Sequence, residues 1–115
     1  MNKEKETMDV EEQAAILGVL ADPTRLKLLK LLSQQQEPDA LCVNALAYRL
    51  GISQSAVSQH LRVLKSTGLI KGERRGYRIH YFISQEALIR VRRRISTALT
   101  LKKQEYHSGR PQGTV

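Results

Sequence analysis

The sequence has 115 residues, enough for one compact domain with a modest core but not for a large enzyme. Lys and Arg outnumber Asp and Glu by 19 to 11, and aromatic residues make up only 4%, so the core must be largely aliphatic. The single Cys excludes an intrachain disulfide, and no apolar run approaches the roughly 18 residues of a membrane span. We therefore expect a cytoplasmic protein that has no signal peptide and is no membrane protein.

The excess positive charge lies in the second half of the chain. Residues 1–48 carry 5 basic and 8 acidic side chains, a balance of −3, whereas residues 49–115 carry 14 basic and 3 acidic ones, a balance of +11. This asymmetry indicates a polyanionic partner such as duplex DNA, RNA or an anionic membrane surface. Lys and Arg can also simply keep a small domain soluble, so the local pattern must separate these alternatives.

Both ends of the chain have the composition of unstructured segments. Residues 1–8 are charged, and residues 107–115 are rich in Gly, Pro and polar residues. We therefore expect flexible termini there and a single folded domain over residues 9–106.

The first part of the domain has the pattern of two helices. Apolar residues recur every three or four positions from Val10 to Ala21, which predicts an amphipathic helix. Asp22 and Pro23 then predict the start of a second helix, because Asp is a good N-cap and Pro is tolerated at the first helical position. That helix is heavily apolar, and the segment Ser33–Asp39 after it reads as a loop.

Two short helices with a tight connection are predicted next. Residues 43–50 favour a short helix that Gly51 ends, and Ser53 is a good N-cap for a helix over residues 54–67, which Gly68 stops. Two helices joined in this way make a helix-turn-helix.

A β-hairpin and a last helix complete the predicted order. Apolar and polar residues alternate between Leu69 and Ile83 around the turn Glu73–Gly76, and a helix follows over residues 85–103. A heptad-like seam runs along that helix at Leu88, Val91, Ile95 and Ala98. The fold class is therefore mainly α with a small β-hairpin, in the order α-α-α-α-β-β-α of a winged helix-turn-helix.

The helix predicted over residues 54–67 has one apolar and one polar face. Val57, Leu61 and Leu64 should pack against the preceding helices. The opposite face is polar and mostly uncharged, and consists of Gln54, Ser55, Ser58, Gln59 and Arg62. These residue types can hydrogen-bond to base edges in the major groove, so the face indicates DNA reading. The alternative is an ordinary solvated face, which would more often carry Glu and Lys pairs.

The predicted hairpin carries a group of arginines near its turn, at Arg74, Arg75 and Arg78. On a winged helix this tip would lie along an adjacent phosphate backbone or enter the minor groove. The alternative is an edge hairpin that charge keeps from pairing with other edges. His60 lies off the exposed face of its helix, so we expect it to be packed or hydrogen-bonded.

Three segments resemble the ArsR/SmtB family of bacterial and archaeal repressors: LADPTRLKLLKLL at residues 20–32, LGISQSAVSQHLRVLKSTGLI at residues 50–70, and RRGYRIHYFI at residues 74–83. The resemblance covers residues from about 15 to 90. It implies a homodimeric winged helix that binds an imperfect palindrome in double-stranded DNA and is released by an inducer. Its first and last helices would form the dimer interface, at Leu17, Leu88, Val91, Ile95 and Ala98. The recognition and wing residues named above would contact the operator.

Cys42 is the candidate sensor residue. Metal-sensing relatives often carry Cys-Val-Cys at this point, but here Asn44 stands at the second position, and the Asp and His pairs of another group are absent from residues 85–103. Soft-metal sites need two or three thiolates or imidazoles, so we expect neither a metal at Cys42 nor any other cofactor. The alternative is a metal-sensor variant in which the dimer or His107 supplies the further ligands. Cys42 otherwise fits a small buried apolar residue or an oxidation sensor.

Two other function classes remain as alternatives to a DNA-binding regulator. A winged-helix module for protein contact would usually expose Leu, Tyr or Trp anchors, which the Gln, Ser and Arg face lacks. An enzyme would need Cys42 within hydrogen-bond reach of His60 or His80, and no orienting carboxylate or Gly-rich phosphate loop is apparent. We therefore expect no enzyme activity.

Overall fold

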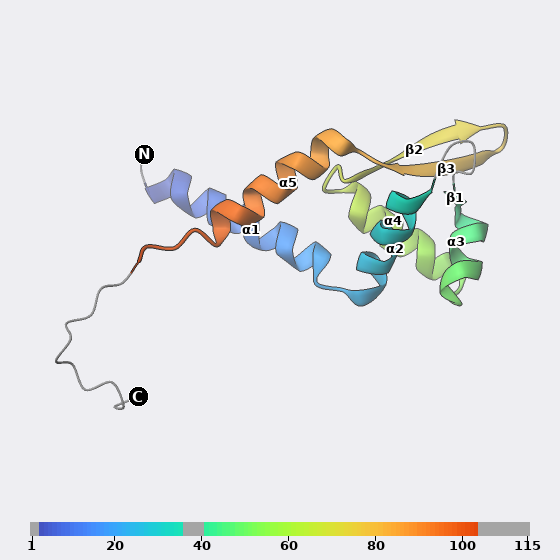
Figure 1. Cartoon of the computed structure of the whole chain (residues 1–115), viewed down its shortest axis with the longest axis horizontal. Coiled ribbons are helices and arrows are strands. Elements are labelled where there is room, and N and C mark those ends of the chain that lie inside the picture. Colours follow the sequence, from blue (N-terminus) through green and yellow to red (C-terminus); the bar gives the residue numbers. More distant parts are fainter. Residues whose placement is uncertain (1–2, 36–40, 104–115) are drawn as a thin grey trace, which may run out of the picture.

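The computed structural model describes residues 3–35 and 41–103. Five helices and three short strands follow one another along these residues (Figure 1). The elements are α1 (Lys3–Leu20), α2 (Pro23–Gln34), β1 (Leu41–Cys42), α3 (Val43–Leu50), α4 (Gln54–Lys65), β2 (Ile70–Arg75), β3 (Arg78–Ile83) and α5 (Gln85–Ala98). The predicted winged helix-turn-helix order is confirmed, with β1 as an additional element.

The two terminal helices differ from their predicted lengths. α1 begins at Lys3, so residues 3–8, predicted to be unstructured, are helical; Lys, Glu and Met are good helix formers and no Pro or Gly interrupts them. α5 ends at Ala98 rather than near Lys103. The Thr100 hydroxyl donates to the carbonyl of Ser96 at 2.7 Å just beyond this end, and Thr is a poor helix former. The predicted flexible segment 107–115 lies outside the described residues.

The predicted helix boundaries around the helix-turn-helix are close to the observed ones. Ser53 caps α4, because its hydroxyl accepts the backbone N–H of Ala56 at 3.0 Å. Gly51 ends α3 with a φ of 68°, a left-handed conformation that glycine adopts without strain. α4 ends at Lys65, slightly before the predicted Thr67, since Ser66 and Thr67 form a turn.

The core lies between α2, α3, α4 and the base of the hairpin. Its largest fully buried side chains are aliphatic: Leu28, Leu46, Val57, Leu61, Leu64 and Leu69. α5 adds Val91 to this cluster. The burial of Val57, Leu61 and Leu64 confirms that the apolar face of α4 packs inward. Burying such a side chain stabilises the fold by roughly 1.5–3 kcal/mol, so the core fixes the orientation of α4 and thereby of its polar face.

The three strands form an antiparallel sheet in the order β1-β3-β2. Arg75 pairs with Arg78, so the turn consists of Gly76 and Tyr77 and the prediction of a turn over Glu73–Gly76 is wrong. Gly76 has a φ of 68°, which suits the first position of a two-residue hairpin loop. β1 was not predicted, because two residues are too few to show a period.

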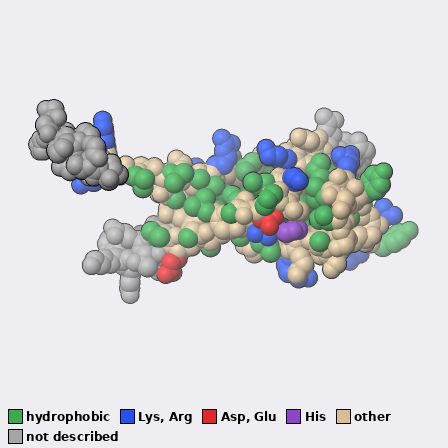
Figure 2. Space-filling view, turned by 90° about the horizontal axis from the view of Figure 1, so that it is seen from below, with side chains coloured by type: hydrophobic (Ala, Val, Ile, Leu, Met, Phe, Trp, Pro, Cys, Tyr) green, Lys and Arg blue, Asp and Glu red, His purple; other side chains and the backbone are tan. Residues whose placement is uncertain are grey.

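α1 packs against α5 and forms an arm at one end of the molecule, while the hairpin lies at the other end (Figure 1). Figure 2 shows hydrophobic side chains along this arm and Lys and Arg side chains around the wider body. Among the described residues, no helix is both long enough and apolar enough to span a bilayer.

Candidate nucleic-acid interface

The polar face of α4 is exposed over its whole length. All five residues predicted to read DNA lie on the surface: Gln54, Ser55, Ser58, Gln59 and Arg62. Val57 and Leu64 on the opposite face are completely buried. The structure therefore brings the predicted recognition residues together on one solvent-facing surface of a helix that its own core holds in place.

Two of these side chains are held against each other. The Arg62 guanidinium donates to the side-chain oxygen of Gln59 at 2.9 Å. These residues are one helical turn apart, so the hydrogen bond restricts both side chains on the exposed face. Arginine and glutamine arranged in this way present several donors and an acceptor to a neighbouring surface.

A hollow of about 300 Å³ lies between α4 and the hairpin. Ser58, Arg62 and Lys65 line it from α4, and Tyr81 lines it from β3. Two cationic and two hydroxyl-bearing side chains line this hollow, and none of its described lining residues is acidic. The hollow therefore suits an anionic strand that passes between the helix and the hairpin. Sequence reasoning missed both Lys65 and Tyr81. Lys65 lies three residues after Arg62 in α4, so helical periodicity could have found it, whereas only the fold brings Tyr81 of β3 beside these residues.

The arginines of the hairpin do not form one cluster. Directly opposed residues share a face of the sheet, so Arg75 and Arg78 lie on one face and Arg74 on the other, opposite Ile79. Arg74 and Arg78 are exposed, and the Arg74 guanidinium also lies within 3.5 Å of the Gly76 carbonyl oxygen.

Arg75 is more restrained than its neighbours. Its guanidinium donates to the Glu73 carboxylate at 2.8 Å and lies 5.0 Å from the centre of the Phe82 ring. The ion pair and the aromatic ring hold this charge along the strand, close to the hairpin surface. At the tip, Tyr77 is 90% exposed. The tip therefore presents an aromatic ring flanked by arginines.

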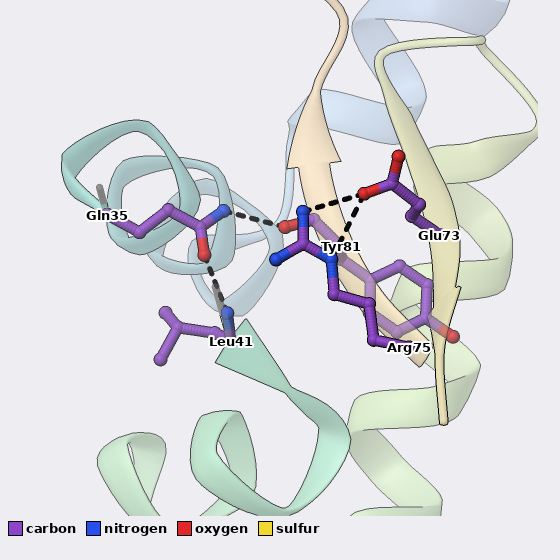
Figure 3. A network of polar contacts seen from close by, with 5 residues as sticks. All are labelled: Gln35, Leu41, Glu73, Arg75 and Tyr81. Atoms are coloured by element: carbon purple, nitrogen blue, oxygen red, sulfur yellow. Dashed lines mark hydrogen bonds and ion pairs between the residues drawn. The ribbon is translucent and has the colours of Figure 1, made fainter. Parts of the chain in front are cut away.

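The hairpin is attached to the segment that precedes α3 (Figure 3). The side-chain N–H of Gln35 donates to the backbone carbonyl of Tyr81 at 2.6 Å. The side-chain oxygen of Gln35 accepts the backbone N–H of Leu41 at 2.6 Å. β1 also pairs directly with β3, with Leu41 opposite Tyr81. These contacts fix the hairpin relative to the helix-turn-helix.

His60 has the structural role predicted for it. Its Nδ1 atom lies 3.3 Å from the guanidinium of Arg25, which also donates to the carbonyl of Val19 at 2.6 Å. His80 lies opposite Cys42 in the sheet register, and its buried Nδ1 atom has no hydrogen-bond partner among the described residues. Cys42 and His80 are thus neighbours across the sheet without a hydrogen bond between them in the part of the chain described.

Cys42 is half-buried at the N-cap position of α3. Burial raises the pKa of its thiol, but the backbone N–H groups of Ala45 and Asn44 and the charge of Arg78 outweigh burial, so the pKa is lowered overall. No group of three or more His, Cys, Asp or Glu side chains within the described ranges could hold a metal ion. The expectation that Cys42 binds no metal stays a prediction.

The predicted dimer residues do not all face solvent. Leu17 on α1 is 38% exposed, whereas Val91 on α5 is 5% exposed and packs in the core of its own chain. Leu88 and Ile95 are half-buried against the same core, so much of the predicted seam is used within the protomer. Other apolar residues are exposed instead: Val10 and Ile89 on the arm, and Leu99 and Leu101 just after α5.

A helix-turn-helix followed by a β-hairpin defines a winged helix protein. Residues 22–71 match the family model described as bacterial regulatory protein, arsR family. The chain is 35% identical over 89 residues to a relative named transcriptional repressor SmtB homolog from Synechocystis, and the match covers 77% of this chain and 64% of that protein. The chain belongs to the arsR family.

Two solved structures support the same fold. The crystal structure of NolR from Sinorhizobium fredii is similar with a TM-score of 0.63 and 31% sequence identity, over 86% of this chain and 94% of that one. The Mycobacterium bovis protein Mb0332, described as a homodimeric winged helix-turn-helix DNA-binding domain, is similar with a TM-score of 0.66 and 25% identity, over 93% and 97% of the two chains. The predicted family and fold class are confirmed.

Proposed function

We propose that this protein is a sequence-specific DNA-binding transcriptional repressor. The observation that carries the proposal is the hollow between α4 and β3, which Arg62, Lys65 and Tyr81 line together. Phosphate contacts made by cations supply most of the affinity of such proteins for duplex DNA. The hollow is positively charged and lies between the helix and the hairpin, so it can hold the negatively charged backbone of DNA.

Each part of the surface has a distinct role in this proposal. α4 enters the major groove, where Gln54, Gln59 and Arg62 reach base edges and select the sequence. The backbone beside the groove passes through the hollow against Lys65. The hairpin tip lies over the adjacent minor groove, with Tyr77 and the flanking arginines against sugar and phosphate.

A homodimer is part of the proposal. The related domain from Mycobacterium bovis is described as homodimeric, and the α1–α5 arm of this chain exposes apolar side chains such as Leu17 and Ile89. Contact between two copies through this arm would cover those side chains. Two-fold symmetry then requires a palindromic operator, since each copy reads one half-site.

The protein-contact module is disfavoured by the composition of the α4 face. None of its five exposed recognition residues is a large apolar or aromatic anchor. Such a module would bind all duplexes alike, in proportion to their charge.

Selection of bound duplexes from a random pool tests the proposal. We expect an enriched inverted repeat that binds at least about 1,000-fold more tightly than a scrambled duplex at the same salt concentration, as measured by fluorescence anisotropy. Equal affinity for the enriched and scrambled duplexes would contradict sequence-specific binding.

A further inference from the structure

A second hollow, of about 310 Å³, lies where α1, α5 and the end of α4 meet, and it shares no described lining residue with the first. Its size is at the lower end of the range for small-molecule sites, roughly 300–1,000 Å³. Nothing in the proposed contacts with DNA uses it. Its lining combines an apolar wall and a charged rim, and the two together restrict the ligands that it can take.

The apolar wall comes from both helices of the arm. Ile16 and Val19 line the hollow from α1, and Val91 lines it from α5. Ile16 and Val19 are half-buried and Val91 is buried, so the wall is part of the packed structure and not a set of mobile surface side chains. A hydrocarbon group placed against it would leave water at little cost to the protein.

The charged rim comes from one side of α5. Arg90 and Arg94 are four residues apart and therefore lie on the same side of that helix. Arg94 pairs with the carboxylate of Glu12, which is the single acidic side chain among the described lining residues. The rim as a whole is therefore positive.

Arg90 differs from Arg94 in its surroundings. It is exposed, and its guanidinium lies over the turn after α4, with Nη2 3.8 Å from the point where a Cβ on Gly68 would be. Among the described residues no carboxylate pairs with it. A guanidinium in this position can bind a carboxylate through two parallel hydrogen bonds.

We propose that this hollow binds a small amphipathic carboxylic acid. Its hydrocarbon part lies against Ile16, Val19 and Val91, and its carboxylate lies on Arg90. The bound acid also touches the end of α4, because Ser66 and Thr67 complete the lining. Their hydroxyls donate to the carbonyls of Val63 and Leu64. This inference concerns binding alone and does not rest on the proposed function.

Calorimetric titration of the full chain without DNA tests the proposal. Octanoate is the probe, and octanol and octylamine are controls that have the same hydrocarbon chain without the negative charge. We expect saturable binding of octanoate, weaker binding of octanol and no binding of octylamine. Absence of saturable octanoate binding, or binding of octylamine as tight as that of octanoate, would overturn the proposal.

Two arginine variants test the position of the carboxylate. Arg90→Gln should weaken octanoate binding about tenfold, the effect of losing a charge-assisted hydrogen bond. Arg92→Gln is the matched control, because Arg92 is an exposed arginine of the same helix that does not line the hollow. Equal effects of the two substitutions would show a non-specific charge effect and overturn the assignment.

A third variant tests the hollow itself. Ala15 lines it and is exposed, so Ala15→Leu adds bulk at the mouth without forcing atoms into the core. We expect this variant to melt like the parent chain and to lose octanoate binding. If octanoate binds the variant as well as the parent, the acid lies elsewhere. If neither protein binds octanoate and the substitution changes the oligomeric state, a second copy covers the hollow.

Discussion

In the proposed complex with DNA, the cationic side chains of α4 have different roles. Arg62 is hydrogen-bonded to Gln59, and both Arg62 and Lys65 line the hollow beside α4. We propose that Arg62 contacts a base edge and that Lys65 contacts the phosphate backbone. A contact to a base edge discriminates between sequences, and a contact to phosphate does not. We therefore expect substitutions of Arg62 and Lys65 to change DNA binding in different ways.

Arg62→Ala should reduce the difference in binding free energy between the operator and a random duplex by about 1–3 kcal/mol. Lys65→Ala should weaken both duplexes alike and reduce the slope of log affinity against log salt by about 1. Anisotropy titrations at several salt concentrations measure both quantities. Equal losses on both duplexes for Arg62→Ala would count against its role at the bases.

Asp22 gives the fold a dependence on pH. The backbone N–H of Arg25 donates to the Asp22 carboxylate at 3.1 Å and lowers the pKa of Asp22 below its ordinary value of 3.8. Desolvation opposes this shift, and the backbone N–H of Thr24 adds to it. A carboxylate with a lowered folded-state pKa stabilises the protein above its unfolded-state pKa. This contribution is lost as the pH falls through the folded-state pKa.

We expect Asp22→Asn to keep the capping hydrogen bond and to remove this part of the acid sensitivity. Asp22→Ala should be less stable than the parent at neutral pH, because α2 loses its cap. Urea denaturation between neutral pH and pH values below 3.8 measures the effect. If the parent chain and Asp22→Asn lose stability in parallel on acidification, the acid sensitivity comes from other groups.

At the scale of the elements, the hairpin depends on the close approach of the Gly72 backbone in β2 to the side chains of β3. Gly72 of β2 lies beside the side chains of β3, and a Cβ built on it would be 2.8 Å from Cγ2 of Ile79 and 3.3 Å from Cε1 of Tyr81. Both distances are shorter than ordinary contacts. No side chain fits at this position without moving its neighbours.

Gly72→Ala should therefore destabilise the fold by about 1–3 kcal/mol, the usual effect of overpacking. This loss exceeds the stabilisation of roughly 0.4–1 kcal/mol that a Gly to Ala change provides by lowering the conformational entropy of the unfolded chain. Urea denaturation measures the change. Adding Ile79→Ala removes the nearest atom, so the double variant should recover stability relative to Gly72→Ala; a further loss would show that Ile79 is not the obstacle.

The elements that sequence patterns predicted are those with strong local signals. α2, α3 and α4 start or end at Asp22, Gly51 and Ser53, which act through neighbouring backbone groups. The position of the hairpin turn was predicted wrongly, because the alternation of apolar and polar residues does not show which residues pair. The observed pairing of Arg75 with Arg78 puts the turn at Gly76 and Tyr77. The end of α5 depends on weak propensities that no strong stop signal marks.

At the scale of the whole molecule, the sequence predicted the exposed face of α4 but not its surroundings. The hollow beside Lys65 exists because β3 places Tyr81 there, and Val91 is a core residue because α5 packs back onto its own chain. Both facts depend on contacts between residues far apart in the sequence. A pattern along the chain shows which side of a helix is apolar but not what covers it.

The apolar surface of the α1–α5 arm leads to a prediction about assembly. Leu17→Glu should weaken the homodimer by about thirtyfold, equal to about 2 kcal/mol, because a charge would be buried in the contact. Leu17 is 38% exposed in the protomer, so Leu17→Glu should leave the protomer folded. Sedimentation velocity at micromolar concentration measures the effect.

Tyr48→Glu is the control for this prediction. Tyr48 is 88% exposed on α3, outside the arm, and its substitution should leave the association unchanged. A Leu17→Glu variant that sediments like the parent would place the dimer contact elsewhere.

The Gln35 amide and the pairing of β1 with β3 fix the hairpin relative to the helix-turn-helix. In the proposed complex, α4 enters one groove and the hairpin lies over the next. Because these links set the separation of the two elements, the duplex rather than the protein has to adjust where groove widths do not match. Base steps that bend or unstack easily, placed between the contacted positions, should therefore strengthen binding although no side chain touches them. The stiffness of the nucleic acid then becomes part of the sequence preference.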